Sequence, residues 1–152
     1  MKKLVIMAGL PASGKSTIRN KNYSNLVFVD CDEIKKSLPN YDPKNPTVAH
    51  AQSKMLEKQA IYNNLAAGIS FLYDTTGTNS DNVIMLTKQA QELGYTVELV
   101  YVKVSLATSL YRNANRERVV PQEIILEKYE LITTSTQVCK MFVDTYTEIE
   151  ND

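Results

Sequence analysis

The sequence predicts an α/β fold, a three-layer sandwich in which a parallel sheet of about five strands is flanked by helices. Short apolar runs alternate with longer segments of helical period, which is typical of strands joined by crossover helices. The apolar fraction of 43% and the charged fraction of 22% are ordinary for a globular protein. A length of 152 residues suits one hydrophobic core. We therefore expect a single domain over residues 1–152.

The predicted strands are short and rich in β-branched and aromatic residues. Residues 4–8 read LVIMA, an uninterrupted apolar run of the kind found in the middle of a parallel sheet. Residues 26–30 (LVFVD) and 70–74 (SFLYD) form the second and third strands, and each ends on an aspartate. Residues 95–104 form a longer fourth strand, and 145–149 (TYTEI) form a fifth.

The segments between these strands have helical periodicity. The predicted helices are residues 15–21, 32–38, 48–67, 82–93, 106–116 and 122–133. Residues 39–46 carry three of the five prolines, which predicts an irregular loop after the second helix. A loop of this kind either holds substrate or serves only as a connector.

Residues 9–17, GLPASGKST, have the spacing of a Walker A motif. The motif follows a predicted strand and opens a predicted helix, which is the context of a working phosphate loop. Its backbone N–H groups and the helix N-terminus face phosphate oxygens, Lys15 adds a cation for the β and γ phosphates, and Ser16 is the expected Mg²⁺ ligand. The sequence therefore predicts a P-loop NTPase-type fold that binds ATP and Mg²⁺. The loop residues expected to bind the nucleotide are Gly9, Ala12, Ser13, Gly14, Lys15, Ser16 and Thr17.

Two aspartates at strand ends are candidates for the acceptor side of the site. Asp32 follows the second strand at the carboxyl edge of the sheet, where ligands of open α/β folds bind. Its carboxylate can accept the proton of an attacking hydroxyl. Asp74 ends the third strand and can hold a water of the magnesium shell or an active-site side chain. The alternative is that these aspartates, or Asp30, only cap helices or turns.

Three arginines, Arg112, Arg116 and Arg118, lie on or just after the predicted helix 106–116. Arg112 and Arg116 are one helical turn apart and are expected to share a face. Guanidinium groups bind phosphate in a forked geometry and stabilise charge on a transferred group. Residues 106–121 are therefore expected to form an arginine-bearing lid, and the alternative is an ordinary solvated basic surface. His50, the single histidine, is predicted to be structural or at the surface.

Together these motifs resemble the phage-type polynucleotide 5′-hydroxyl kinases and the zeta-toxin-like small P-loop kinases. The resemblance rests on residues 9–17, 32–38, 74–79 and 112–121. It implies that Asp32 is the general base and that Arg116, in the arginine-bearing lid, contacts the donor phosphates. Lys15 is expected to be catalytic as well, and Arg112 is expected to bind the nucleotide. At the position of Lys35 the family has an arginine that contacts a phosphate on the acceptor side. Lysine keeps the positive charge but cannot make the forked, two-point contact of a guanidinium group. The turn after Asp74 is longer than in the family and the lid spacing one residue shorter, so the acceptor is less well defined than the kinase chemistry.

The leading hypothesis for function is an ATP-dependent kinase that transfers the γ-phosphoryl group to a polynucleotide 5′-hydroxyl, so that a DNA or RNA end is the acceptor. One alternative is a small-metabolite, nucleotide or toxin-like sugar-nucleotide kinase, and another is a non-enzymatic nucleotide-binding switch. Lysine plus arginine (17) equals aspartate plus glutamate (17), so no overall basic field attracts nucleic acid. The neutral charge favours a small acceptor, whereas the resemblance favours a nucleic-acid end.

Cysteine content and hydropathy give an expected compartment. Cys31 and Cys139 have neither the spacing of a zinc site nor a disulfide framework, which indicates a reducing, cytoplasmic environment. The apolar start of the chain passes directly into the phosphate loop, so we interpret it as a strand and not as a signal peptide. No stretch approaches the roughly 18–20 apolar residues of a membrane span, and no membrane association is expected.

Overall fold

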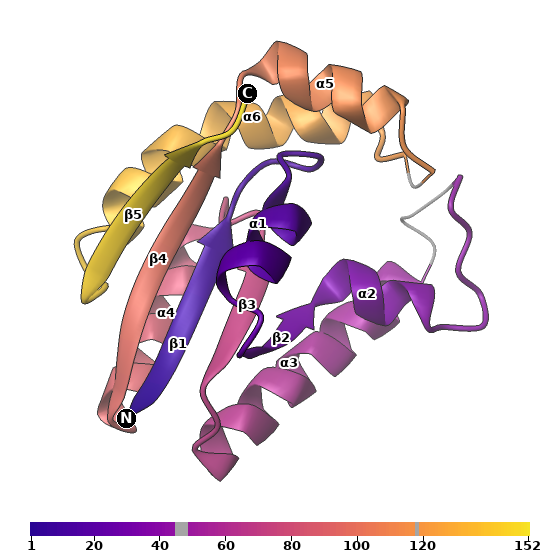
Figure 1. The fold of residues 1–152 in the computed structure, drawn as a ribbon. Helices are drawn as coiled ribbons and strands as arrows, with labels where there is room; N and C mark the ends of the chain where they lie inside the picture. The colour runs from indigo at the N-terminus through magenta and orange to yellow at the C-terminus, as the bar shows by residue number, and fades with distance from the viewer. Residues whose placement is uncertain (45–48, 118) are drawn as a thin grey trace.

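A computed structural model describes residues 1–44, 49–117 and 119–152. Its centre is a sheet of five parallel strands in the order β2-β3-β1-β4-β5. The strands are β1 (Lys2–Ala8), β2 (Val27–Asp30), β3 (Phe71–Thr75), β4 (Tyr95–Lys103) and β5 (Thr145–Glu150). This architecture confirms the predicted α/β class with a parallel sheet, and all five predicted strands are present (Figure 1).

Helices cover both faces of the sheet and make the outer layers of the sandwich (Figure 1). They are α1 (Lys15–Asn22), α2 (Cys31–Lys36), α3 (His50–Ala67), α4 (Ser80–Glu92), α5 (Leu106–Ala114) and α6 (Gln122–Cys139). Buried side chains of α3, α4 and α6 form one core with the sheet, and α1 contributes Ile18 to a second core on the opposite face. The short α1 thus rests on the sheet directly after the phosphate loop.

The central strand β1 explains the uninterrupted apolar run at the start of the sequence. Leu4, Ile6 and Ala8 belong to the core beneath α3 and α4, whereas Val5 and Met7 belong to the core beneath α1. All five side chains are fully buried, because successive residues of a strand face opposite sides of the sheet. Burial of such a valine, leucine or isoleucine stabilises the fold by about 1.5–3 kcal/mol.

Several predicted helix ends differ from the structure: α2 ends at Lys36 instead of residue 38, α4 begins at Ser80 instead of residue 82, and α5 and α6 also end elsewhere. The helix predicted over 106–116 ends at Ala114, where the N–H of Asn115 bonds back to the carbonyls of Arg112 and Asn113. Arg116 therefore lies beyond the helix. The last helix extends to Cys139 instead of residue 133, because residues such as Ser135 and Thr136 bond to backbone carbonyls and do not break it.

The segment after α2 is only partly described. Residues 39–44 contain no helix or strand, in agreement with the predicted loop, and residues 45–46 of that loop lie outside the described residues. The start of the helix predicted at residue 48 also lies outside them. In the described ranges, no helix combines the length and apolar character needed to cross a membrane.

Candidate active site

The phosphate loop, residues 9–14, passes from β1 to α1 through backbone in the left-handed region. Ala12 has φ 63° and Gly14 has φ 91°. A residue with a Cβ rarely adopts positive φ, and such strain is concentrated at ligand-binding loops. Left-handed residues in a turn direct successive N–H groups to one side, which makes an anion-binding concavity. Gly14 caps α1 without a side chain, so the first N–H groups of that helix are available to phosphate oxygens.

Close packing requires glycine at both fixed positions of the motif. A Cβ on Gly9 would lie 2.8 Å from Ser13 Oγ and 2.8 Å from the carbonyl oxygen of Val102. A Cβ on Gly14 would lie 2.4 Å from Nδ2 of Asn151. Ser13 Oγ is itself buried and has no hydrogen-bond partner among the described residues. A buried hydroxyl without a hydrogen-bond partner inside a phosphate loop can donate a hydrogen bond to an oxygen of a bound phosphate.

Lys15 begins α1 and reaches back beneath the loop. Its Nζ donates to the carbonyl oxygens of Gly9 and Thr75, both at 3.0 Å. It also lies 3.3 Å from Oδ1 of Asp74, at the end of β3. The ammonium therefore connects the loop to the neighbouring strand, at the place where the motif predicts a cation for the nucleotide phosphates.

Arg19, which the sequence reasoning missed, lies beside Lys15 and holds two carboxylates together. It is 5% exposed, and its Nη1 lies 3.0 Å from Oδ2 of Asp30 and 3.1 Å from Oδ2 of Asp74. Its guanidinium carbon lies 3.8 Å from the ring centroid of Phe28, a cation–π contact. We call Lys15, Arg19, Asp30 and Asp74 the charged floor. The signal for Arg19 was its position four residues after Lys15, on the same face of α1.

Asp30 and Asp32 have different surroundings. Oδ1 of Asp30 accepts the backbone N–H of Asp32 at 2.9 Å, so Asp30 is the N-cap of α2. Burial, followed by the negative charges of Asp74 and Asp32, raises the pKa of Asp30, and the hydrogen bond from Arg19 opposes this shift. Asp32 lies in the first turn of α2, half-buried, in the wall of a cavity. The capping alternative therefore applies to Asp30 and not to Asp32.

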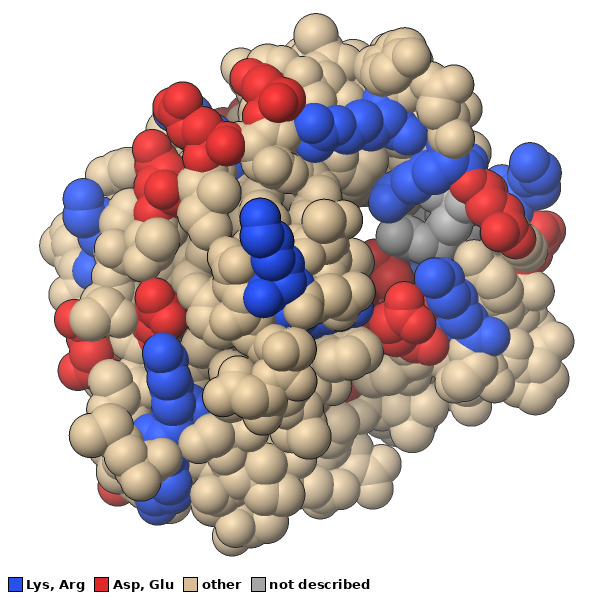
Figure 2. All heavy atoms as spheres, viewed as in Figure 1, with Lys and Arg blue, Asp and Glu red and all other residues tan. Residues whose placement is uncertain are grey.

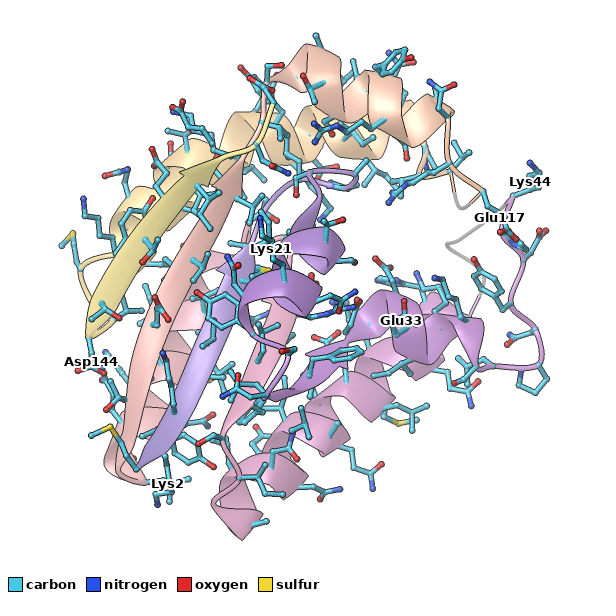
Figure 3. All side chains as sticks on the ribbon, in the orientation of Figure 1. Lys2, Lys21, Glu33, Lys44, Glu117 and Asp144 are labelled. Carbon is cyan, nitrogen blue, oxygen red and sulfur yellow. The ribbon has the colours of Figure 1, made fainter. Side chains whose placement is uncertain are left out.

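A cavity of about 850 Å³, which we call the donor cavity, opens beside the phosphate loop. Ser16 and Thr17 of α1, both exposed, line one side, and Asp32 lines another. Figure 2 shows this hollow with basic side chains along its upper edge and both acidic and basic side chains along its lower edge. Glu33 of α2 and Glu117 beyond α5 lie at different points around it (Figure 3). Its walls thus carry both cationic and anionic side chains.

The lid residues Arg112 and Arg116 both line the donor cavity, although they are not on one helical face as predicted. Arg112 donates from Nη1 to the carbonyl oxygen of Ser13 at 3.3 Å and from Nη2 to that of Asn151 at 2.8 Å. Nδ2 of Asn151 donates to the same Ser13 carbonyl at 2.7 Å. Arg112 and the end of the chain therefore close one side of the phosphate loop. Arg118 lies outside the described residues.

Asn113 organises the lid from within. It is 4% exposed, and its side chain bonds both backbone groups of Val120, with Nδ2 donating at 2.8 Å and Oδ1 accepting at 2.9 Å. Oδ1 also accepts from Nε of Arg116 at 3.3 Å. The side-chain amide of Asn113 thus holds the connection between α5 and α6 in place, and it also orients the guanidinium group of Arg116 in the donor cavity. The sequence offered no signal for it beyond its place between two arginines.

A second cavity of about 210 Å³, which we call the acceptor cavity, adjoins the charged floor. Lys15, Asp30, Asp32 and Asp74 line both cavities. Its other walls bring together side chains from α2, α3, the end of the lid and α6. Among these are Lys35, His50, Lys54, Val120, Pro121 and Lys128. Lys35, expected on the acceptor side, is therefore beside Asp32.

His50, predicted to be structural or at the surface, is exposed at the start of α3 and also lines the acceptor cavity. Its Nδ1 lies 3.2 Å from Nζ of Lys35. Because an ammonium only donates, the imidazole must be neutral and accept at Nδ1. Burial lowers the pKa of His50, the positive charges of Lys35, Lys54 and Lys128 lower it further, and Asp32 acts in the opposite direction. The ring is therefore neutral at pH 7.

Comparison with known proteins gives the family context for this geometry. The family model described as zeta toxin matches residues 1–151, nearly the whole chain. The L-seryl-tRNA(Sec) kinase of Methanococcus maripaludis is 28% identical over 139 residues, which cover 86% of this chain and 52% of that protein. The chain thus spans about half the length of this curated relative.

Solved structures share the fold. A structure of the PezAT chromosomal toxin–antitoxin system of Streptococcus pneumoniae matches with a TM-score of 0.77 and 15% identity, covering 100% of this chain and 70% of that chain. A structure of AvrRxo1-ORF1:-ORF2 with ATP also matches with a TM-score of 0.77, at 18% identity, covering 91% of this chain and 49% of that one. The five-stranded parallel sheet and its flanking helices are therefore a fold that these solved structures share.

Proposed function

The chain belongs to the zeta toxin family, and we propose that it is an ATP-dependent kinase that transfers the γ-phosphoryl group to a hydroxyl acceptor. One observation carries the proposal. The carboxylate-bearing residue Asp32 lines both the donor cavity, beside the phosphate loop, and the acceptor cavity. A hydroxyl bound in the acceptor cavity is thus next to a base on one side and to a nucleotide phosphate on the other.

The donor side binds ATP by its phosphates. Backbone N–H groups at Ala12 to Gly14 and the N-terminus of α1 face the phosphate oxygens, and Lys15 neutralises charge on the β and γ groups. Ser16, an exposed residue that lines the donor cavity, would hold Mg²⁺, and Asp30 and Asp74 line the same cavity. When bound, Mg²⁺ supplies Lewis-acid neutralisation of the phosphate charge. Arg112 and Arg116 stabilise negative charge on the transferred group.

The acceptor side activates the hydroxyl. A carboxylate oxygen of Asp32 accepts the hydroxyl proton as the acceptor oxygen forms a bond to the γ phosphorus and the bond from that phosphorus to the β–γ bridging oxygen breaks. ADP leaves with the electron pair of the broken bond. Asp30, occupied in capping α2 and pairing with Arg19, keeps Asp32 at a fixed position in the first helical turn. The reaction is therefore phosphoryl transfer to an alcohol.

A nucleic-acid end or a related nucleotide is the acceptor that we favour. The relative in Methanococcus maripaludis is named for a seryl-tRNA acceptor, and Lys35 occupies the place of a family arginine that engages an acceptor phosphate. The family description as a toxin favours the second candidate, a sugar nucleotide. The two classes share a phosphate close to the reacting sugar, which suits the lysines of the acceptor cavity.

Transfer of labelled γ-phosphate from ATP tests the proposal. The acceptors are 5′-hydroxyl DNA and RNA oligonucleotides, a seryl-tRNA, nucleosides and sugar nucleotides, each with Mg²⁺. We expect label on at least one acceptor, loss of transfer by about 10²- to 10⁴-fold in Asp32→Asn, and unchanged ATP binding in that variant. Glu92→Gln, an exposed carboxylate at the end of α4, is the matched control. ATP binding with no label on any acceptor would instead support a nucleotide-binding switch.

A further inference from the structure

The acceptor cavity gathers three lysines from three separate elements. Lys35 comes from α2, Lys54 from α3 and Lys128 from α6, and all three line the same space of about 210 Å³. Lys35 is 5% exposed, and its ammonium bonds to the neutral ring of His50. Among the described residues, no carboxylate lies within 4.0 Å of that ammonium. A buried charge without a counterion is costly, and an anionic ligand would supply the missing partner.

Lys54 is held at this cavity by a buried carboxylate. Its Nζ lies 3.2 Å from Oε2 of Glu57, one helical turn further along α3. Glu57 is 4% exposed, and its other oxygen accepts the hydroxyl of Tyr73 on β3. Burial and the charge of Glu57 raise the pKa of Tyr73, so its hydroxyl stays protonated and remains a donor. Glu57 is thereby fixed to the sheet and restricts where Lys54 can lie.

Lys128 approaches from the opposite wall, on the helix that follows the lid. It is half-buried, and the charges that act on it are those of Lys54, Glu127, Lys15 and Asp32. Burial lowers its pKa, and the charge of Lys54 lowers it further. Two cations that destabilise each other across a small cavity gain most from an anion placed between them. Burial also strengthens that attraction, because water screens it less.

We propose that Lys54 and Lys128, together with Lys35, clamp a phosphate group of the acceptor, and that Glu57 is the positioning residue for Lys54. The resemblance implies such a contact for Lys35 alone, whereas the clamp by Lys54 and Lys128 follows from the geometry of the cavity. Three ammonium groups on three separate elements suit a phosphate, because its oxygens are arranged tetrahedrally around phosphorus, whereas the two oxygens of a carboxylate lie in one plane. The inference rests on the proposed function.

The clamp defines the class of acceptor. Asp32 lines the same cavity as the three lysines, so the reacting hydroxyl and the bound phosphate belong to neighbouring parts of one molecule. A nucleotide, an oligonucleotide end and a sugar nucleotide meet this requirement. A free sugar or a nucleoside does not, because neither carries the anion. Lys128 also places part of the clamp on α6, so acceptor binding connects the α2–α3 side of the site to the lid side.

Calorimetric titration with inorganic phosphate tests the clamp without requiring turnover. The full chain is first saturated with a non-hydrolysable ATP analogue and Mg²⁺, so that the phosphate loop is occupied, and ionic strength is kept constant. We expect the wild type to bind phosphate, and Lys54→Ala and Lys128→Ala each to weaken binding by about tenfold or more. Lys58→Ala, an exposed lysine one turn after Lys54, should bind as the wild type does. Glu57→Gln should weaken binding less than Lys54→Ala.

Two results would overturn the clamp: no phosphate binding by the nucleotide-loaded wild type, or equal affinity in the wild type, Lys54→Ala and Lys128→Ala. If an alanine variant loses its folded circular dichroism spectrum, Lys54→Gln and Lys128→Gln replace it, because they remove the charge and keep the length. Phosphate binding with no transfer to any acceptor would refute the proposed kinase activity alone. Transfer that proceeds normally in both lysine variants would refute the clamp alone.

Discussion

The charged floor and the acceptor cavity contain similar residues but balance their charges differently. On the floor, the cations Lys15 and Arg19 are matched by Asp30 and Asp74 through contacts of 3.0–3.3 Å. In the acceptor cavity, the described ion pairs of the three lysines consist of Lys54 with Glu57. The floor is thus complete within the protein, whereas the acceptor cavity has an excess of positive charge.

This difference separates residues that maintain the fold from residues that we propose bind the acceptor. A buried ion pair whose partners are all present is destabilised severely when one partner is removed. A cluster of like charges is itself destabilising. Removal of one of these charges should therefore leave the stability of the fold unchanged or higher, but it should lower the affinity for an anionic ligand. Substitutions on the floor should therefore change stability or chemistry strongly, and substitutions in the acceptor cavity should change mainly acceptor binding.

The largest effect is expected from Lys15→Ala, which removes the floor cation aimed at the nucleotide phosphates. Phosphoryl transfer should fall by about 10³-fold, or about 4 kcal/mol of transition-state stabilisation. Measurement of kcat and of nucleotide binding on the same protein distinguishes chemistry from affinity. Lys21→Ala is the control, since Lys21 is exposed on the same helix (Figure 3). Transfer within a few-fold of the wild type would remove Lys15 from the catalytic role.

Arg19→Leu should have the next largest effect, this time on stability. It leaves Asp30 and Asp74 facing each other without their shared cation, at an expected cost of about 3 kcal/mol in the free energy of unfolding. Urea denaturation monitored by circular dichroism measures it. Arg19→Leu combined with Asp30→Asn should recover part of the loss, because one buried charge is gone. A loss below about 0.5 kcal/mol, as for a surface change, would contradict the charged floor.

Asn113→Ala should cost less but should affect both sides of the site. The backbone N–H and carbonyl of Val120 lose their partners, for an expected loss of about 2 kcal/mol in stability. The guanidinium of Arg116 also loses its Oδ1 acceptor, so kcat should fall as well. Asn115→Ala changes an exposed amide on the same lid and should stay within about 0.5 kcal/mol. An unchanged kcat in folded Asn113→Ala would leave this asparagine a structural role only.

The smallest effect is the pH dependence contributed by His50. The pKa of His50 in the folded protein lies below its ordinary value of 6.5, so between the two values the unfolded chain binds the proton and the folded chain does not. The free energy of unfolding should therefore fall as pH drops below 6.5, and His50 should contribute no slope above it. Lys35, Lys54, Lys128 and Asp32 all face the ring. Comparison of His50→Asn with the wild type from pH 5 to 8 isolates this slope, and equal slopes would contradict it.

The sequence predicted the floor of the site better than its walls. The Walker A motif is continuous and has the correct strand and helix around it, so Lys15 and Ser16 could be placed without a structure. Asp30 and Asp74 could be placed at the sheet edge because parallel strands end together. Arg19 needed the additional knowledge that β2 and β3 are neighbours in the sheet.

The walls depend on contacts between distant segments. Lys54 and Lys128 are exposed or half-buried lysines on regular helices, and nothing in the local pattern distinguishes them from solvated surface charges. Only the approach of α3 and α6 brings them to one cavity. Asn151 contacts the phosphate loop because β5 ends beside it. The end of α5 at Ala114 was also missed, and so were the bonds of Asn113 to Val120, because these join residues seven positions apart.

The most direct test of the account compares one hydroxyl acceptor with and without its neighbouring phosphate. The first pair is a short 5′-hydroxyl oligonucleotide and the corresponding nucleoside, and the second is a sugar nucleotide and its free sugar. The account predicts that kcat/KM is at least about 100-fold higher for the phosphate-bearing member of the accepted pair, which corresponds to two charge-assisted contacts. Lys54→Ala and Lys128→Ala should shrink that ratio. Equal efficiency for both members of each pair would contradict the view that the unbalanced lysines recognise the acceptor.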